Sequence, residues 1–174
     1  MTQDIPTQKS NASVVLLKLL IFTLLVPCTF TLWLPRYFYP SIYRTSVEWN
    51  VVSVAAVVLM AMGVAGYLWT SLGFAIYGRG TPAPIDPPKE LVVRGLYRYV
   101  RNPMYISVAT VLGGECLLLR SWVLARYLAW CFGIIFVVVL VYEEPVLRGK
   151  FGESYRQYCR EVPRWIPRLR QPPH

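Results

Sequence analysis

The chain has 174 residues, a length that suits one compact unit. Hydrophobic residues make up 55% of it and charged residues only 16%, which excludes an ordinary soluble domain, because a chain of this size could not bury so much apolar surface. The net charge of +9 does not indicate nucleic-acid binding, because the eighteen Lys and Arg residues are concentrated outside the apolar segments, where anionic lipid headgroups would lie. We therefore expect a single membrane domain over 1–174, in contact with the lipid bilayer.

The first two apolar segments follow a polar N-terminal stretch. Segment 14–34 is about 21 residues long, enough to cross about 30 Å of hydrocarbon. No small-x-small cleavage site follows it, which disfavours a cleaved signal peptide. Aromatic residues and two arginines between 35 and 50 are typical of a membrane interface. The next segment, 51–76, contains Gly63 and Gly66, which allow close packing between helices. We predict one transmembrane helix in each apolar segment.

A proline-rich loop leads to the second pair of apolar segments. Residues 78–88 include four prolines and cannot continue a helix. The third apolar segment, 104–119, is short, and Arg120-Ser121 connects it tightly to the fourth, 122–142. We predict that the third and fourth segments are transmembrane helices and form a helical hairpin.

An amphipathic helix is expected over 145–162. Pro145 fits the first turn of a helix, and apolar or aromatic residues then recur every three or four positions opposite a basic side. This pattern is typical of a helix that lies on the membrane surface. The residues that we interpret as membrane anchors are Tyr155, Tyr158, Trp165 and Ile166.

The distribution of basic residues predicts the orientation. The N-terminal tail, the 78–103 loop and the C-terminal tail carry thirteen Lys or Arg residues, and the two opposite loops carry three. By the positive-inside rule both termini are expected in the cytoplasm, and an even number of spans agrees with this.

Few residues suit metal binding. None of the four cysteines forms a C-x-x-C pair, and the only histidine is His174, so we expect no metal site and no imidazole general base within the fold. We assign no catalytic residue. Glu115 lies within an apolar segment, and we expect it to pair with Arg120 near the membrane surface.

Two clusters of charged and aromatic residues flank the predicted hairpin. The first runs from Lys89 to Tyr105 and the second from Glu143 to Tyr158, closing with Val162-Pro163. Because one cluster begins the third helix and the other ends the fourth, a hairpin brings them together at the cytoplasmic interface.

These clusters resemble the isoprenylcysteine carboxyl methyltransferase family and its phospholipid methyltransferase relatives. The family pattern is G-x-Y-x-x-x-R-H/N-P-x-Y, an apolar hairpin, and then E-E-x-x-L-x-x-x-F-G-x-x-Y-x-x-Y-x-x-x-V-P. This chain matches it from about Lys89 to Pro167, under half of its length. The resemblance implies an all-α, multi-pass membrane methyltransferase that uses S-adenosyl-L-methionine. The methyl acceptor is expected to be lipophilic or small: a carboxylate like that of isoprenylcysteine, a lipid amine or a thiol.

The resemblance also implies which residues bind the cofactor. The guanidinium of Arg101 can pair with the cofactor carboxylate, and Glu143 can accept from its ammonium or ribose hydroxyls. Aromatic rings can pack on the adenine or face the sulfonium. The predicted cofactor-binding residues are Lys89, Glu90, Leu91, Val92, Tyr97, Arg101, Asn102, Pro103, Tyr105 and Glu143.

Two positions depart from the family pattern. Asn102 stands where many members have His, and Asn cannot act as a base near neutral pH. Val139 stands where the eukaryotic isoprenylcysteine enzymes have an Arg that contacts substrate, which favours an amine or thiol acceptor over a carboxylate. The alternatives are a non-catalytic membrane scaffold and an NADPH enzyme similar to sterol reductases, for which 174 residues is short.

Overall fold

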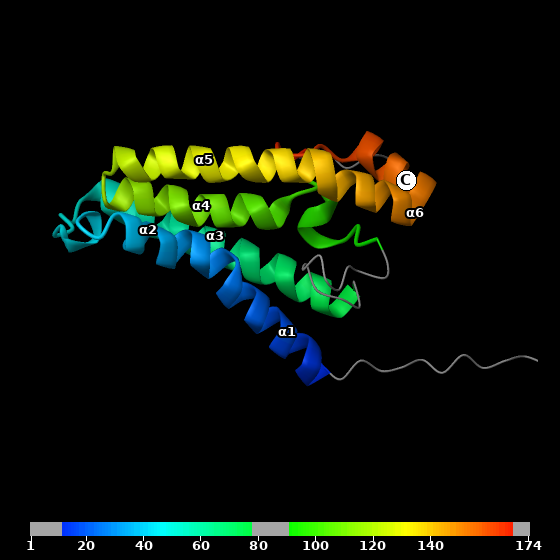
Figure 1. Cartoon of the computed structure of the whole chain (residues 1–174), viewed down its shortest axis with the longest axis horizontal. Coiled ribbons are helices and arrows are strands. Elements are labelled where there is room, and N and C mark those ends of the chain that lie inside the picture. The colour runs from blue at the N-terminus through cyan, green and yellow to red at the C-terminus, as the bar shows by residue number, and fades with distance from the viewer. Residues whose placement is uncertain (1–11, 78–90, 169–174) are drawn as a thin grey trace, which may run out of the picture.

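The computed structural model describes residues 12–77 and 91–168, which are helices joined by short turns, without strands in these ranges (Figure 1). The α-helices are α1 (Ala12–Leu25), α2 (Leu34–Phe38), α3 (Val51–Tyr77), α4 (Pro103–Leu118), α5 (Trp122–Val138) and α6 (Glu144–Glu161). The other helical elements of these ranges are two π-helical turns, Thr29–Trp33 and Val139–Glu143, and two 3₁₀ turns, Ile42–Arg44 and Gly95–Arg98.

In the part of the chain that the structure describes, three continuous helical stretches are long and apolar enough to cross a membrane: Leu16–Phe38, Val51–Gly73 and Trp122–Glu161. A shorter apolar helix, Pro103–Leu118, lies between the last two. Large apolar side chains on these helices face outward, as lipid contact requires. The protein is therefore an all-α membrane protein, as the hydropathy pattern predicts. In the 40-residue last stretch, only the part up to about residue 142 is apolar enough to lie in the bilayer.

Small residues bring the backbones of α3 and α4 into contact. A Cβ atom added to Gly114 would lie 2.4 Å from Cγ of Met60 and 2.9 Å from the carbonyl oxygen of Ala56. A Cβ atom on Gly63 would lie 2.8 Å from the carbonyl oxygen of Ser107. The expected close packing at Gly63 is confirmed, and Gly114 supplies the matching surface on α4.

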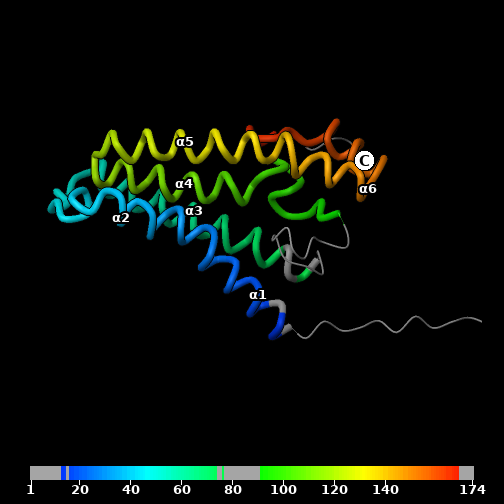
Figure 2. The backbone as a smooth tube through the Cα atoms, in the orientation of Figure 1, coloured from blue at the N-terminus to red at the C-terminus, as the bar shows by residue number. Residues whose placement is uncertain are grey.

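Helix α1 diverges from the other helices toward its N-terminal end (Figure 2). Thr23 on α1 hydrogen-bonds to the hydroxyl of Tyr67 on α3 over 2.7 Å. Beyond Leu25 the chain continues through the Thr29–Trp33 turn into α2, which lies beside the ends of α3 and α4. The α1 end that diverges is on the side of the molecule where α6 lies.

The predicted pairing of Glu115 with Arg120 is wrong. Glu115 is buried on α4, and its carboxylate lies 3.8 Å from Nη1 of Arg36 and accepts a hydrogen bond from Tyr43 over 3.3 Å. Arg120 instead pairs with Glu48 at 3.3 Å. The reason is that α2 and the turn after it fold back over the end of α4. Residues distant in sequence, Arg36 and Tyr43, therefore contact Glu115 in place of Arg120.

The fourth apolar helix passes into α6 through the π-helical turn Val139–Glu143. Pro145 lies in the first turn of α6, as expected, and because it has no N–H it cannot continue the hydrogen bonds of the π-helical turn before it. The predicted single helix is broken at Gly152, whose φ of 55° and ψ of −125° fall in a region that glycine tolerates best. The second half of α6 thereby changes direction and lies against the segment that precedes α4.

The interpretation of Tyr155 and Tyr158 as membrane anchors is wrong. Their side chains are only 3% and 6% exposed, and with Val162 they form a buried cluster against Leu91 and Phe151. Trp165 is half-buried, because its ring packs 4.9 Å from that of Phe132 on α5. Ile166, at 80% exposure, is free to reach lipid.

Candidate functional site

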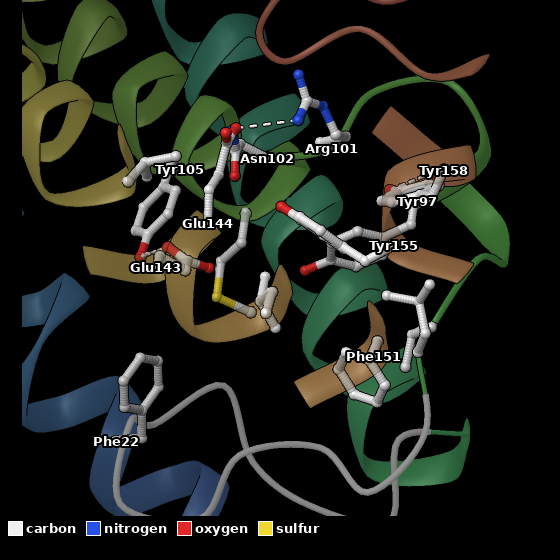
Figure 3. Close-up of a pocket in the computed structure, with 15 residues that line it drawn as sticks. Phe22, Tyr97, Arg101, Asn102, Tyr105, Glu143, Glu144, Phe151, Tyr155 and Tyr158 are labelled. Atoms are coloured by element: carbon white, nitrogen blue, oxygen red, sulfur yellow. Dashed lines mark hydrogen bonds and ion pairs between the residues drawn. The ribbon is translucent and has the colours of Figure 1, made fainter. Parts of the chain in front are cut away.

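A pocket lies where the α4–α5 hairpin meets α6, and Figure 3 shows its lining. The pocket is partly open to solvent, and its enclosed cavity volume is about 110 Å³. Side chains from α1, from 91–105 and from 139–158 converge on it. The lining residues are Phe22, Leu91, Val92, Tyr97, Arg101, Asn102, Met104, Tyr105, Val139, Glu143, Glu144, Leu147, Phe151, Tyr155 and Tyr158.

The segment before α4 turns sharply into the pocket. Gly95 has a φ of 58°, which favours glycine, and a Cβ atom there would lie 3.1 Å from Nε1 of Trp69. Asn102 precedes a proline and is held outside the helical region, with φ −119° and ψ 50°. Pro103 then begins α4. This local sequence places Arg101 and Tyr105 on the two sides of the helix start, both facing the pocket.

Glu144 is the centre of an ion cluster. Arg164 donates from Nε to Oε1 over 2.6 Å and from an Nη atom to Oε2 over 3.0 Å. Arg101 reaches Oε1 over 3.0 Å, and Arg148 reaches Oε2 over 3.4 Å. The hydrogen bond and the charge of Glu144 raise the pKa of Arg164 above its usual value, although burial opposes this. One carboxylate therefore faces three cations, and the cluster has an excess of positive charge.

Arg101 retains hydrogen-bonding capacity. Its side chain is 10% exposed, and Nη1 contacts Sγ of Cys159 at 2.9 Å as well as Glu144. Its Nε is buried and has no hydrogen-bond partner within 12–77 and 91–168. A buried donor left without a partner costs about 1–3 kcal/mol, so an arginine of this kind favours an acidic ligand.

Glu143 and Tyr105 form a second polar pair, away from the ion cluster (Figure 3). The Tyr105 hydroxyl donates to Oε2 of Glu143 over 3.0 Å. Among the described residues no basic side chain pairs with Glu143, although the neighbouring Glu144 contacts three arginines. Glu143 therefore presents a carboxylate to the pocket without a counter-ion from the described chain.

Tyrosine side chains form one wall of the pocket. Tyr158 donates a hydrogen bond to the carbonyl oxygen of Tyr97 over 2.7 Å, and its ring lies 6.1 Å from that of Tyr155. Burial raises the pKa of Tyr97 well above its usual value, and the nearby acidic groups of Tyr158, Glu143 and Tyr105 raise it further. Tyr97 is therefore a neutral phenol near pH 7.

The remaining wall is apolar. Phe22 extends from α1 toward the Glu143 side of the pocket, and Met104, Val139 and Leu147 line the space with it. Val139 is only 1% exposed. The pocket is therefore amphipathic, with a cationic and aromatic part near Arg101 and an apolar part near Phe22.

The family model for phospholipid methyltransferases matches residues 51–154. The chain belongs to this family. The match begins with α3 and ends within α6. It therefore includes the pocket residues at the start of the α4–α5 hairpin, Arg101 and Tyr105, and those at its end, Glu143 and Glu144.

Three relatives resemble this phospholipid methyltransferase family member over parts of their length. The nickel-cobalt-cadmium resistance protein NccN of Alcaligenes xylosoxydans xylosoxydans is 29% identical over 128 residues, covering 70% of this chain and 55% of the relative. The protein-S-isoprenylcysteine O-methyltransferase of Schizosaccharomyces pombe is 35% identical over 77 residues, covering 44% and 33%. An uncharacterized protein of Haemophilus influenzae is 40% identical over 70 residues, covering 36% and 100%.

The chain thus spans about half the length of the resistance protein and about one third of the length of the isoprenylcysteine methyltransferase. No solved structure matches it.

The fold brings most of the predicted cofactor-binding residues to this one pocket. Pro103 does not line it but begins α4, and Lys89 and Glu90 lie outside the described residues. Asn102 lines it and donates from Nδ2 to the carbonyl oxygen of Arg164 over 3.2 Å. The predicted residues that line the pocket are Leu91, Val92, Tyr97, Arg101, Asn102, Tyr105 and Glu143.

Sequence reasoning missed several lining residues. Phe151, Tyr155 and Tyr158 belong to the second family motif, and that motif was the available signal for them, but their helical periodicity was interpreted as a membrane face. Glu144 was not predicted to bind cofactor, although its position in the motif points to the pocket. No sequence signal identifies Phe22, which only the course of α1 brings near.

Proposed function

We propose that this protein transfers a methyl group from S-adenosyl-L-methionine to a lipophilic acceptor at the membrane interface. The observation that carries the proposal is one pocket in which a cationic, aromatic part and an apolar part meet beside Glu143. The first part suits a soluble, zwitterionic cofactor, and the second suits a group that arrives from lipid. Membership of the phospholipid methyltransferase family supports the same reaction class.

The residues on the cationic side fit the proposed cofactor. Arg101 has a buried Nε that finds no partner among the described residues, and the positive excess around Glu144 favours a ligand carboxylate. Tyr97 and Tyr155 offer rings against which an adenine or a sulfonium can pack. The bound cofactor would supply an already activated methyl group. The protein therefore mainly has to bind and align the two reactants.

The residues on the other side suit handling of a proton. Glu143 carries a carboxylate at the junction of the two parts, and Tyr105 fixes its orientation through a 3.0 Å hydrogen bond. An amine or thiol acceptor must lose a proton during methyl transfer, and Glu143 is placed to accept it. The apolar side chains of Val139 and Met104 exclude water from the same region.

The charges of the pocket favour an amine or thiol acceptor over a carboxylate. A carboxylate placed beside Val139 would face the negative Glu143, and among the described lining residues the only cation is Arg101, which contacts Glu144. An amine acceptor needs no cation beside it. A nearby carboxylate attracts its protonated form and can then accept the proton. We therefore extend the proposal to a lipid amine or a small lipophilic thiol.

The decisive experiment measures methyl transfer directly. Full-length protein in lipid nanodiscs is incubated with methyl-labelled S-adenosyl-L-methionine and a panel of lipid amines, thiols and prenylcysteine, and labelled products are identified. We expect a labelled lipophilic product with wild-type protein and with Arg156→Gln, which changes an exposed α6 side chain that does not line the pocket, and little with Arg101→Gln. A protein that binds NADPH but neither transfers label nor binds S-adenosylhomocysteine would refute the proposal. Binding of no cofactor would favour a scaffold.

A further inference from the structure

Residues 163–168, which we call the C-terminal strap, run from the end of α6 along the segment that precedes α4. The backbone N–H of Arg101 donates to the carbonyl oxygen of Pro163 over 2.9 Å, and the N–H of Arg168 donates to that of Tyr99 over 3.0 Å. Between these two bonds Asn102 donates to the carbonyl oxygen of Arg164 over 3.2 Å. The strap therefore fixes the backbone on which the proposed cofactor-binding Arg101 is mounted.

The strap is itself held in place by aromatic packing. The ring of Trp165 lies 4.9 Å from that of Phe132 and is stacked at 5.9 Å from that of Phe136, both on α5. It also lies 6.5 Å from the ring of Tyr105. The strap therefore packs on α5 and hydrogen-bonds to the residues before α4, so it connects the two helices of the hairpin at the pocket end.

Arg164 and Arg101 share one carboxylate. Arg164 holds both oxygens of Glu144, at 2.6 and 3.0 Å, in a forked pair, while Arg101 reaches only Oε1 through one nitrogen. Forked arginine–carboxylate pairs are strong, so Arg164 takes most of the hydrogen-bonding capacity of Glu144. Arg101 is thereby kept from a forked pair of its own and retains donors for another anion.

We propose that Arg164 is a positioning residue, which acts through Glu144 and the strap to hold Arg101 ready for a ligand carboxylate. This inference rests on the proposed function, because the carboxylate is that of the methyl donor. Without Arg164, Glu144 can form a forked pair with Arg101 and compete with the ligand. The loss should fall on ligands that carry the carboxylate and spare ligands that lack it.

Arg148 provides a matched control. It contacts the same carboxylate, at 3.4 Å from Oε2, but it lies on the first turns of α6, is 55% exposed and belongs to no strap. Substitution of Arg148 by Gln removes the same charge from the same cluster while leaving the forked pair and the strap bonds in place. Arg164→Lys is the second matched variant, because its ammonium keeps the charge but lacks the planar guanidinium fork.

The experiment compares two ligands on full-length protein in detergent by calorimetry. S-Adenosylhomocysteine carries the amino-acid carboxylate, and 5′-methylthioadenosine lacks the whole amino-acid group. For Arg164→Gln we expect a roughly tenfold loss of affinity for S-adenosylhomocysteine and less than about twofold for methylthioadenosine. Arg148→Gln should change both affinities by less than about twofold, and Arg164→Lys should fall between wild type and Arg164→Gln.

Four results would overturn the inference. Equal S-adenosylhomocysteine affinity in wild type and Arg164→Gln would remove Arg164 from the site while leaving the proposed function intact. Equal losses for both ligands, or equal losses in the Arg164 and Arg148 variants, would show a general distortion or a general charge effect. A wild-type protein that binds neither ligand would overturn the proposed function and this inference together. If Arg164→Gln does not fold, the same comparison is made with Arg164→Lys.

Discussion

The hydroxyl of Tyr105 donates a hydrogen bond over 3.0 Å to the carboxylate of Glu143, and this bond joins the start of α4 to the end of the apolar part of the last helix. The two residues belong to different motifs and meet only because the α4–α5 hairpin returns the chain to the same end. The bond uses Oε2 of Glu143 and fixes the orientation of this carboxylate, which lines the pocket (Figure 3). Tyr105 is therefore expected to act on the acceptor side, through Glu143.

Tyr105→Phe removes this hydroxyl and keeps the ring. A hydrogen bond to a charged group contributes about 1.5–3 kcal/mol, so we expect methyl transfer to slow by roughly tenfold or more. Affinity for S-adenosylhomocysteine should change by less than about twofold, because Arg101 and the tyrosine wall are intact. Single-turnover rates and calorimetry measure the two quantities. A parallel fall in rate and cofactor affinity would instead place Tyr105 on the cofactor side.

Arg101→Ala removes the proposed partner of the cofactor carboxylate. Loss of one member of a charge pair costs about 2–5 kcal/mol, and a partly open site places the cost at the low end, which is roughly a thirtyfold loss of affinity. Calorimetric titration with S-adenosylhomocysteine tests this, with Arg156→Ala as the control because Arg156 is exposed and pairs with Glu153 on α6. Unchanged affinity in a folded Arg101 variant would remove Arg101 from the binding site.

Gly114→Ala should separate α3 from α4. The added methyl group would lie 2.4 Å from Cγ of Met60 and 2.9 Å from the carbonyl oxygen of Ala56, and the backbone cannot yield as a side-chain end can. Overpacking of this kind costs about 1–3 kcal/mol. Unfolding in mixed detergent micelles is the measurement, and Gly133→Ala is the control because a Cβ atom there meets nothing within 4 Å. Equal stability of the two variants would contradict the close contact.

Hydropathy and helix-end chemistry predicted most of the fold. The four apolar segments, the place of Pro145 in the first turn of α6 and the close approach at Gly63 all follow from local sequence. The partner of Glu115 could not be predicted, because it depends on how the segment after α1 folds back. Arg36 is distant in sequence, yet it lies 3.8 Å from the carboxylate. Proximity in sequence favoured Arg120, and the tertiary fold gave Arg120 a different partner, Glu48.

The candidate site was predicted where motif residues carry recognisable chemistry. Arg101 and Glu143 were selected because a guanidinium and a carboxylate suit a zwitterionic cofactor, and both line the pocket. Tyr155 and Tyr158 were misinterpreted, because a periodic apolar stripe defines a helix face but not what covers it. Here the break at Gly152 turns that face onto the segment before α4, so protein rather than lipid buries it.

The predicted orientation of the chain can be tested by labelling. Thirteen Lys or Arg residues lie in the tails and the 78–103 loop and three in the opposite loops, a distribution from which the positive-inside rule predicts cytoplasmic termini. Single cysteines at Ser121, in the α4–α5 turn, and at Ser154, exposed on α6, are introduced into a background without native cysteines. A membrane-impermeant maleimide added outside intact cells should label position 121 only. Labelling of position 154 under the same conditions would reverse or refute the topology.

The pH dependence of methyl transfer distinguishes the two classes of acceptor. An alkyl amine has a pKa near 10, so between pH 6 and 9 its reactive neutral fraction grows about tenfold for each pH unit. A prenylcysteine carboxylate, with a pKa near 3.5, is fully ionised throughout this range and should react at a rate that does not change with pH.

Because Glu143 faces the pocket without a basic partner from the described chain and Val139 supplies no cation, we expect lipid amines or thiols to be the better acceptors and their rates to rise with pH. Rates are measured at saturating cofactor, so that changes in cofactor binding do not contribute. Glu143→Gln keeps the shape of the side chain but cannot accept the proton, and it should slow the amine reaction most at low pH, where the protonated acceptor dominates. Efficient methylation of farnesylcysteine at a constant rate from pH 6 to 9, unaffected by Glu143→Gln, would show that a carboxylate is the natural acceptor and that another cation, such as Arg148, holds it.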